Sequence, residues 1–216
     1  MPNGLLLGIE EDERLLAGLR AGTPALLGAG RLVLEALSCS LDCSQCWRWS
    51  PRIEQPPELD AELLRANARW LARFCQVQRP AMASATPELE EGETVLELAA
   101  RICGRGPGLT PSGDDFLAGW LASCWLLYGP HPVFLAAGQR IAKIAGQRTN
   151  TLSQCWLACA VAGDVAYPIH ALLASLLSND RELLELAASN VLALGATSGY
   201  DLLQGVLAGI EQFPLF

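Results

Sequence analysis

The hydrophobic pattern of residues 1–57 differs from that of the rest of the chain. Short apolar runs at 4–9 and 31–37 predict β-strands, and the tryptophan-bearing run at 46–53 predicts a third. Charged residues and leucines at helical spacing predict a helix over 10–20. Gln55-Pro56-Pro57 closes this β-containing part and is the expected boundary, because prolines interrupt regular structure.

From residue 58 onward, apolar residues recur at spacings of three and four, which predicts helices. Phe116–Tyr128 is apolar on all sides, so it is expected to be a buried central helix. The sequence therefore predicts an α+β protein, with a β-containing portion at 1–57 and a helical domain at 58–216 that form one structural unit. The expected helices cover 58–78, 88–103, 116–128, 133–146, 154–162, the segment around His170, 181–192 and 200–212.

The composition is that of a well-buried globular chain. Of its 216 residues, 51% are hydrophobic and 18% are charged, and the net charge is −8. This charge argues against nucleic acid and anionic membrane surfaces as partners. The longest apolar run is shorter than a membrane span, and the first residues do not resemble a signal peptide, so a cytoplasmic protein is expected.

Three of the eight cysteines have a spacing that binds metal clusters in other proteins. Cys39, Cys43 and Cys46 form Cys-x3-Cys-x2-Cys, which is similar to the iron–sulfur motif of radical-SAM enzymes. Gln45 stands where that family has an aromatic residue, and no fourth ligand for zinc is evident nearby. Chance spacing is therefore favoured. The remaining cysteines lie in apolar helical segments and are expected to be small buried hydrophobes.

A glycine-rich polar loop leads into the central helix. Its glycines, Gly106, Gly108 and Gly113, allow main-chain N–H groups to approach a ligand closely. Ser112 stands at the expected N-cap position, with Asp115 three residues later. A helix N-terminus carries partial positive charge and free N–H groups, so this loop predicts an anion site. Capping alone is the simpler alternative.

The two aspartates, Asp114 and Asp115, complicate a phosphate site. Two carboxylates repel a phosphate unless Mg²⁺ or a proton intervenes. The loop therefore predicts either phosphate with Mg²⁺, or a carboxylate that acts as a base or accepts hydrogen bonds. If Asp114 has such a role, Asp114→Asn abolishes activity or binding and leaves the fold intact.

Two further helix entrances have similar chemistry. Residues 146–153 are rich in hydroxyl groups and carry Arg148, and an N-cap is expected at Asn150 or Thr151. Residues 195–205 repeat the Thr…Ser-Gly-x-Asp…Gly arrangement of the first loop, with a glycine four residues after the aspartate. A glycine at that place allows two helices to approach closely. The repeat predicts paired helix N-termini that meet at one site.

The candidate site is defined by these three entrances. Its catalytic candidates are Asp114 and Asp115. Its substrate-binding candidates are Arg105, Gly106, Gly108, Thr110, Ser112, Gly113, Arg148, Thr149, Asn150, Thr151, Ser198, Gly199 and Asp201.

The motif from Gly106 to Gly119, Gly-Pro-Gly-Leu-Thr-Pro-Ser-Gly-Asp-Asp-Phe-Leu-Ala-Gly, resembles the hallmark of the bacterial AllH-like family. The blocks at 149–153 and 197–201 also resemble that family, so the resemblance covers about residues 90–212. It implies an α+β subunit that works with two other subunits to exchange carbamoyl groups between oxalurate and carbamoyl phosphate. The N-terminal part is short and cysteine-rich for the family, and no catalytic residue is carried over.

Other functions remain open beside this one. Residues 112–119 are also similar to the Gly-x-Gly-Asp-x-Phe segment of ribokinase-like sugar kinases, in which an aspartate acts as base and backbone amides stabilise the transferring phosphate. The large βαβ core of those kinases is not evident in this sequence. The alternatives are therefore a non-catalytic effector-binding or regulatory subunit, or a phosphate-transfer enzyme with a kinase-like anion hole. Homo-oligomers are compatible with each function.

Overall fold

A computed structural model gives the fold of most of the chain. The described residues divide into two compact units that separate between Ser50 and Pro51. We describe each unit by itself. The structure describes residues 20, 22–45, 50–81, 83, 87, 90 and 93–211.

The first unit contains a three-stranded antiparallel sheet in the order β1-β2-β3. Strands β1 (Leu26–Gly28) and β2 (Arg31–Leu34) form a hairpin. Its two central residues, Ala29 and Gly30, both have positive φ, as a tight hairpin turn with the twist of its strands requires. A short 3₁₀ helix, η2 (Glu35–Leu37), then leads into β3 (Cys39–Asp42).

The expected strands of this unit are partly correct. The run at 31–37 forms a strand only up to Leu34 and then turns into η2. Strands β1 and β3 were not expected, because three and four residues give too little alternation to be recognised. The predicted strand at 4–9 and, apart from the non-helical Arg20, the predicted helix at 10–20 lie outside the described residues.

The predicted strand at 46–53 can be assessed only from Ser50 onward. In place of a strand, Arg52 forms an isolated β-bridge with Asp164. The Ile53 N–H donates to the Gly163 carbonyl at 2.8 Å, and Arg52 Nε lies 2.7 Å from Asp164 Oδ1. These contacts attach the start of the second unit to the loop between two of its helices.

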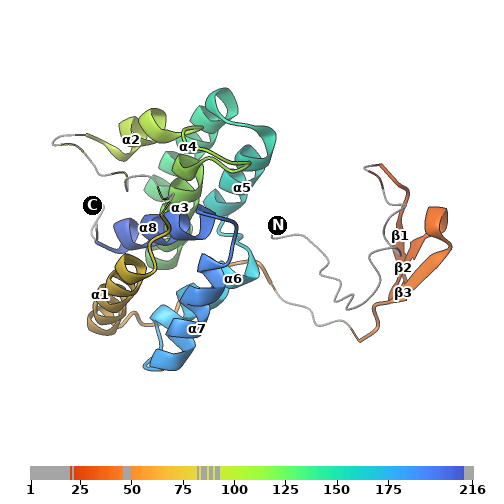
Figure 1. Cartoon of the computed structure of the whole chain (residues 1–216), viewed down its shortest axis with the longest axis horizontal. Helices are drawn as coiled ribbons and strands as arrows, with labels where there is room; N and C mark the ends of the chain where they lie inside the picture. Colours follow the sequence, from red (N-terminus) through yellow and green to blue (C-terminus); the bar gives the residue numbers. More distant parts are fainter. Residues whose placement is uncertain are drawn as a thin grey trace. The chain divides into compact units, whose positions relative to one another are not determined.

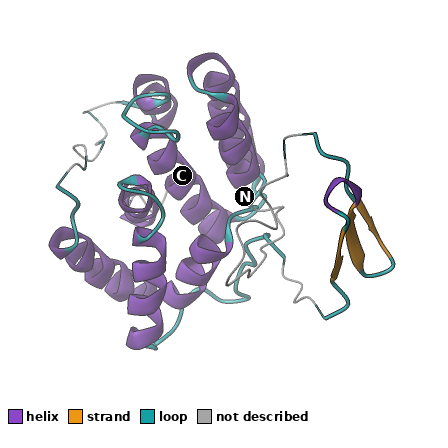
Figure 2. Ribbon diagram, turned by 45° about the vertical axis from the view of Figure 1, so that its right-hand side comes forward, coloured by secondary structure: helices purple, strands orange, loops and turns teal. Residues whose placement is uncertain are grey.

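The second unit consists of eight α-helices within the described residues, and the α+β class is confirmed (Figures 1 and 2). The largest error in a predicted helix boundary is at α2 (Val95–Ile102). The helix expected from residue 88 starts at Val95, because Thr94 and Glu97 form a capping box that fixes its first turn. The helices are α1 (Ala61–Val77), α2 (Val95–Ile102), α3 (Ser112–Tyr128), α4 (Pro132–Arg148), α5 (Thr151–Val161), α6 (Tyr167–Leu176), α7 (Arg181–Leu192) and α8 (Ser198–Glu211).

Helix α3 is the buried central helix that the sequence predicts. It is buried from Ser112 to Leu126 and packs against α2, α4, α5 and α8. Its main partner is α8, which lies alongside it (Figure 1). Gly119 packs against the backbone of Leu202, and Gly209, further along α8, packs against Ser123. Contacts that advance together along both helices make the pair parallel, so the two N-termini lie at the same end.

The cysteine expectation is correct for the core and wrong for α5. Cys75, Cys103 and Cys124 are buried, but Cys155 is exposed and Cys159 is half-buried. Both lie on the side of α5 that faces away from Leu157, which is buried. Among the helices that the structure describes, none is long and apolar enough to cross a membrane.

Candidate functional site

The N-termini of α3 and α8 meet, as the repeated sequence pattern predicts. The hydroxyl groups of Thr110, just before α3, and Ser198, the first residue of α8, are 3.0 Å apart and share a hydrogen bond. The two segments are 88 residues apart in the chain. The packing of α3 on α8 therefore places two polar helix entrances next to each other.

Asp115 lies at this junction. Thr110 Oγ1 donates a hydrogen bond of 3.0 Å to Asp115 Oδ2, and the Ser198 hydroxyl also interacts with this carboxyl group. Only 4% of Asp115 is exposed. Burial raises its pKa to about 7, and the charges of Asp201 and Asp114 add to this, whereas the two hydroxyl groups act in the opposite direction. Asp115 can therefore hold or release a proton near neutral pH.

Asp201 occupies the corresponding place on α8. It is 5% exposed, and burial raises its pKa, while the hydroxyls of Ser112 and Thr197 act in the opposite direction. The Ser112 hydroxyl faces Asp201 without forming a hydrogen bond of normal geometry, since Ser112 Oγ and Asp201 Oδ2 are both buried and lack a partner among the described residues. Each aspartate thus faces the serine that begins the other helix.

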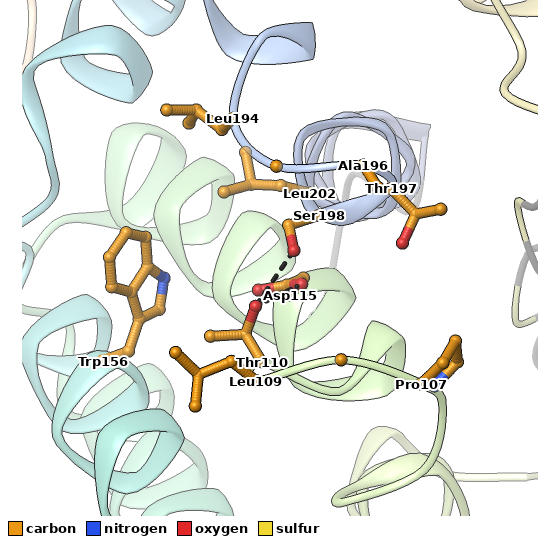
Figure 3. A pocket seen from close by; sticks show the side chains of 12 residues that line it. Pro107, Leu109, Thr110, Asp115, Trp156, Leu194, Ala196, Thr197, Ser198 and Leu202 are labelled. Carbon is orange, nitrogen blue, oxygen red and sulfur yellow. Dashed lines mark hydrogen bonds between the residues drawn. The ribbon is translucent and has the colours of Figure 1, made fainter.

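A cavity of about 400 Å³ opens beside Asp115 (Figure 3). This volume is in the range of small-molecule sites. Among the described residues, no lysine, arginine or histidine lines it. Its polar side chains are those of Thr110, Asp115, Thr197 and Ser198, and its larger apolar side chains are those of Leu109, Trp156, Leu194 and Leu202.

Asp114 points away from this cavity and connects two loops. Its Oδ1 accepts a hydrogen bond of 2.8 Å from the Gly104 N–H, and its Oδ2 accepts one from the Thr149 hydroxyl. Asp114 is 2% exposed. The two candidate catalytic carboxylates therefore diverge, and no group of three or more metal-binding side chains occurs in the described parts of the chain.

The candidate anion ligands are mostly engaged within the chain. The Gly113 N–H donates to the Arg105 carbonyl at 3.0 Å, and the Gly199 N–H donates to the Leu194 carbonyl at 2.9 Å. The Arg148 guanidinium group donates to the Ala100 carbonyl at 2.7 Å. Arg105 is exposed, and neither arginine is among the residues that line the cavity.

The other predicted site residues shape the loop that carries Thr110. Gly108 lines the cavity, and Gly106 lies so close to Ser112 that a Cβ there would come within 2.7 Å of the Ser112 nitrogen. Asn150 caps α5 and also donates to the Leu109 carbonyl at 2.9 Å, which attaches the loop to α5. Thr151 is the exposed first residue of that helix.

The expected capping role of Ser112 is wrong. Pro111 is the N-cap of α3, and its carbonyl accepts from the N–H groups of Asp114 and Asp115 at 2.8 and 3.1 Å. The fixed φ of proline suits this position at the start of a helix. Ser112 is consequently inside the first turn, so its hydroxyl caps nothing and faces α8.

Sequence reasoning missed several walls of the cavity. Trp156 is half-buried on α5 and lies across the cavity from Asp115 (Figure 3). A tryptophan about one turn after a polar helix start could have indicated this position in the sequence. That signal is weak by itself. Leu194 and Thr197 come from the loop between α7 and α8. This loop reaches the cavity only because α8 packs against α3, which the sequence around Leu194 and Thr197 does not indicate.

One family model, described as oxamate carbamoyltransferase subunit AllH, matches residues 102–210, slightly more than half of the chain. The matched region begins at the last residue of α2 and includes all of the cavity-lining residues. No solved structure matches the chain.

Proposed function

The chain belongs to the AllH family of oxamate carbamoyltransferase subunits, and we propose that its cavity is a substrate site for carbamoyl transfer. The observation that supports this most directly is the position of Asp115, a buried carboxyl group at the wall of a cavity of about 400 Å³ within the matched region. The ligand is a small substrate with carboxylate and amide groups, such as oxalurate or oxamate.

The proposed reaction requires one proton transfer. Phosphate attacks the terminal ureido carbonyl of oxalurate, a C–O bond forms, and the C–N bond to the oxamate nitrogen breaks. The products are carbamoyl phosphate and oxamate, and the proton of hydrogen phosphate ends on the oxamate nitrogen. We assign to Asp115 the relay of this one proton: its protonated carboxyl group donates to the leaving nitrogen, and the resulting carboxylate takes up the proton of hydrogen phosphate. A pKa of about 7 is suited to both parts of this relay.

In this proposal Thr110 and Ser198 position the substrate and Asp115, whereas Asp114 holds the loop in place. The subunit works together with other subunits, which supply the remaining groups that bind phosphate. Asp114 and Asp115 do not converge on one point, so they do not form a Mg²⁺ site together. In this proposal, any Mg²⁺ that accompanies the phosphate is bound by the other subunits.

The test is reconstitution of the enzyme with its partner subunits, followed by an assay of carbamoyl phosphate formed from oxalurate and phosphate. We expect activity that depends on this chain, and we expect Asp115→Asn to reduce turnover by about 10²–10⁴-fold, the usual contribution of a general acid. Glu185→Gln, which removes an exposed acid on α7, is the matched control and should retain full activity.

The same assay separates this proposal from a regulatory subunit. If the partner subunits turn over oxalurate without this chain, and the chain alters only their dependence on substrate concentration, the cavity binds an effector. If Asp115→Asn leaves turnover unchanged in a folded complex, the proton-donor role is wrong.

A further inference from the structure

We propose that the cavity recognises the uncharged primary amide of its ligand, through the carboxyl group of Asp115 and the neighbouring hydroxyls of Thr110 and Ser198. This inference rests on the proposed function and specifies which end of the substrate enters the site. The amide lies at the junction of α3 and α8, and the carboxylate of the same molecule lies away from Asp115.

The polar groups of the cavity suit a ligand that donates hydrogen bonds. They are three hydroxyls and one carboxyl, and no cationic side chain lines the cavity among the described residues. The amides of Gly113 and Gly199, two of those expected to hold an anion, already donate to carbonyl groups of the chain. A carboxylate or phosphate placed against Asp115 would therefore meet like charge with little compensation.

A second carboxyl group behind the first strengthens this selection. Asp201 is only 5% exposed, and its Oδ2 lacks a hydrogen-bond partner among the described residues. Its charge acts on Asp115, and it interacts with Thr197, which lines the cavity. Asp201 does not itself line the cavity, but its charge makes this end of the cavity unfavourable for an anion.

An amide suits this end better than an ammonium ion. A carboxyl group that holds a proton near neutral pH can donate to the amide oxygen and accept from the amide nitrogen at the same time, which an ammonium ion cannot match. The walls formed by Leu109, Trp156 and Leu202 are apolar, and burial of an uncharged group there costs far less than burial of a charge.

The experiment compares oxamate with oxalate, which differ by one amide in place of a carboxylate. Titration calorimetry on the full chain measures both affinities, and methylammonium serves as the cationic probe. We expect oxamate to bind at least about tenfold more tightly than oxalate and methylammonium not to saturate the site. Glu185→Gln is the control and should bind oxamate like the unchanged protein.

Two substitutions of Asp115 examine the pairing itself. Asp115→Ala should weaken oxamate binding by at least about tenfold, because the amide loses its partner. Asp115→Asn should remain within about fivefold, since an asparagine amide can pair with the ligand amide by donating and accepting. A thermal melt of each variant verifies folding, and Thr110→Val provides a second, nearly isosteric variant that should also weaken binding.

The inference is overturned if oxalate binds as tightly as oxamate, if methylammonium saturates the site, if no probe binds, or if folded Asp115→Ala retains its affinity. These outcomes are separate from failure of the proposed function. An amide-selective chain whose reconstituted complex forms no carbamoyl phosphate would refute the proposed function alone. An active complex without amide selectivity would refute this inference alone.

Discussion

Gly205 of α8 packs directly against the carbonyl of Phe116 in α3. The relationship is reciprocal, because Gly119 of α3 packs in the same way against the carbonyl of Leu202 in α8. Each glycine comes four residues after an aspartate of its own helix, Asp115 or Asp201. Each contacted carbonyl belongs to the residue directly after one of these aspartates. The two helices therefore form a pseudo-symmetric parallel pair that brings Asp115 and Asp201 together.

The close approach of α3 and α8 predicts that Gly205→Ala destabilises the protein. A Cβ at this position would overlap the Phe116 carbonyl oxygen, which belongs to the backbone and cannot move aside as a side chain can. We expect a loss of about 1–3 kcal/mol in the free energy of unfolding, as for other overpacked cores. Urea denaturation measures this quantity.

Gly146→Ala provides the matched control for this prediction. Gly146 is exposed in α4, and a Cβ there would meet nothing within 4 Å. The higher helix propensity of alanine should stabilise the protein by up to about 1 kcal/mol. Equal effects of the two substitutions would contradict the close packing of α3 on α8.

Asp114→Asn tests whether this aspartate is catalytic or structural. The sequence alone predicts loss of activity with an intact fold. The contacts with Gly104 and Thr149 predict instead a loss of about 1–3 kcal/mol of stability, because an amide NH₂ group replaces one of the two acceptor oxygens and the Thr149 hydroxyl must reverse its hydrogen bond. Urea denaturation and the reconstituted assay distinguish the two results. Unchanged stability with lost turnover would return the catalytic role to Asp114.

The helices and the meeting of two helix starts could be predicted from the sequence for physical reasons. Helix α7 was predicted at its observed bounds, and its buried residues, Leu184, Ala187, Ala188 and Val191, recur at spacings of three and four. The pairing of α3 with α8 followed from the repeated Ser-Gly-x-Asp…Gly pattern, since small residues at equal spacing mark a close helix contact.

The different roles of Asp114 and Asp115 could not be predicted from the sequence. Adjacent residues on a helix point about 100° apart, so a pair of aspartates gives no indication of which one faces a cavity. Their partners, Thr149 and Ser198, come from distant segments. The role of Ser112 was missed for a similar reason, because a serine before an apolar helix resembles a cap until the position of Pro111 is known.

Ser112→Ala should therefore have little effect on stability. The Ser112 hydroxyl is buried without a hydrogen-bond partner among the described residues, so its removal costs no hydrogen bond. Asn150→Ala removes a real N-cap and the contact with the Leu109 carbonyl, and should cost about 1–2 kcal/mol. Thermal denaturation of both variants compares them. A larger loss for Ser112→Ala would contradict this prediction and would show that the interaction of its hydroxyl with Asp201 stabilises the fold.

The buried carboxyl of Asp115 predicts a pH-dependent stability with a definite sign. Its pKa is about 7 in the folded protein and 3.8 in the unfolded chain, so between these values the folded state holds a proton that the unfolded state has released. The free energy of unfolding contributed by this group consequently falls as the pH rises through this window and becomes constant above it. Two neighbouring carboxyl groups, Asp201 on α8 and Asp114 on α3, add to the effect of burial and raise its pKa, whereas the hydroxyls of Ser198 and Thr110 lower it.

Asp115→Asn isolates this contribution, because asparagine is nearly isosteric and does not titrate. Between pH 5 and pH 8, the unchanged protein should lose as much as about 3 kcal/mol of stability relative to the variant, about two pKa units at 1.36 kcal/mol each. Urea denaturation of both proteins at each pH gives the difference directly, and Glu185→Gln should follow the unchanged protein. Parallel curves for the unchanged protein and Asp115→Asn would mean that Asp115 is ionised throughout, and a proton donor at the junction of α3 and α8 would then have to be sought elsewhere.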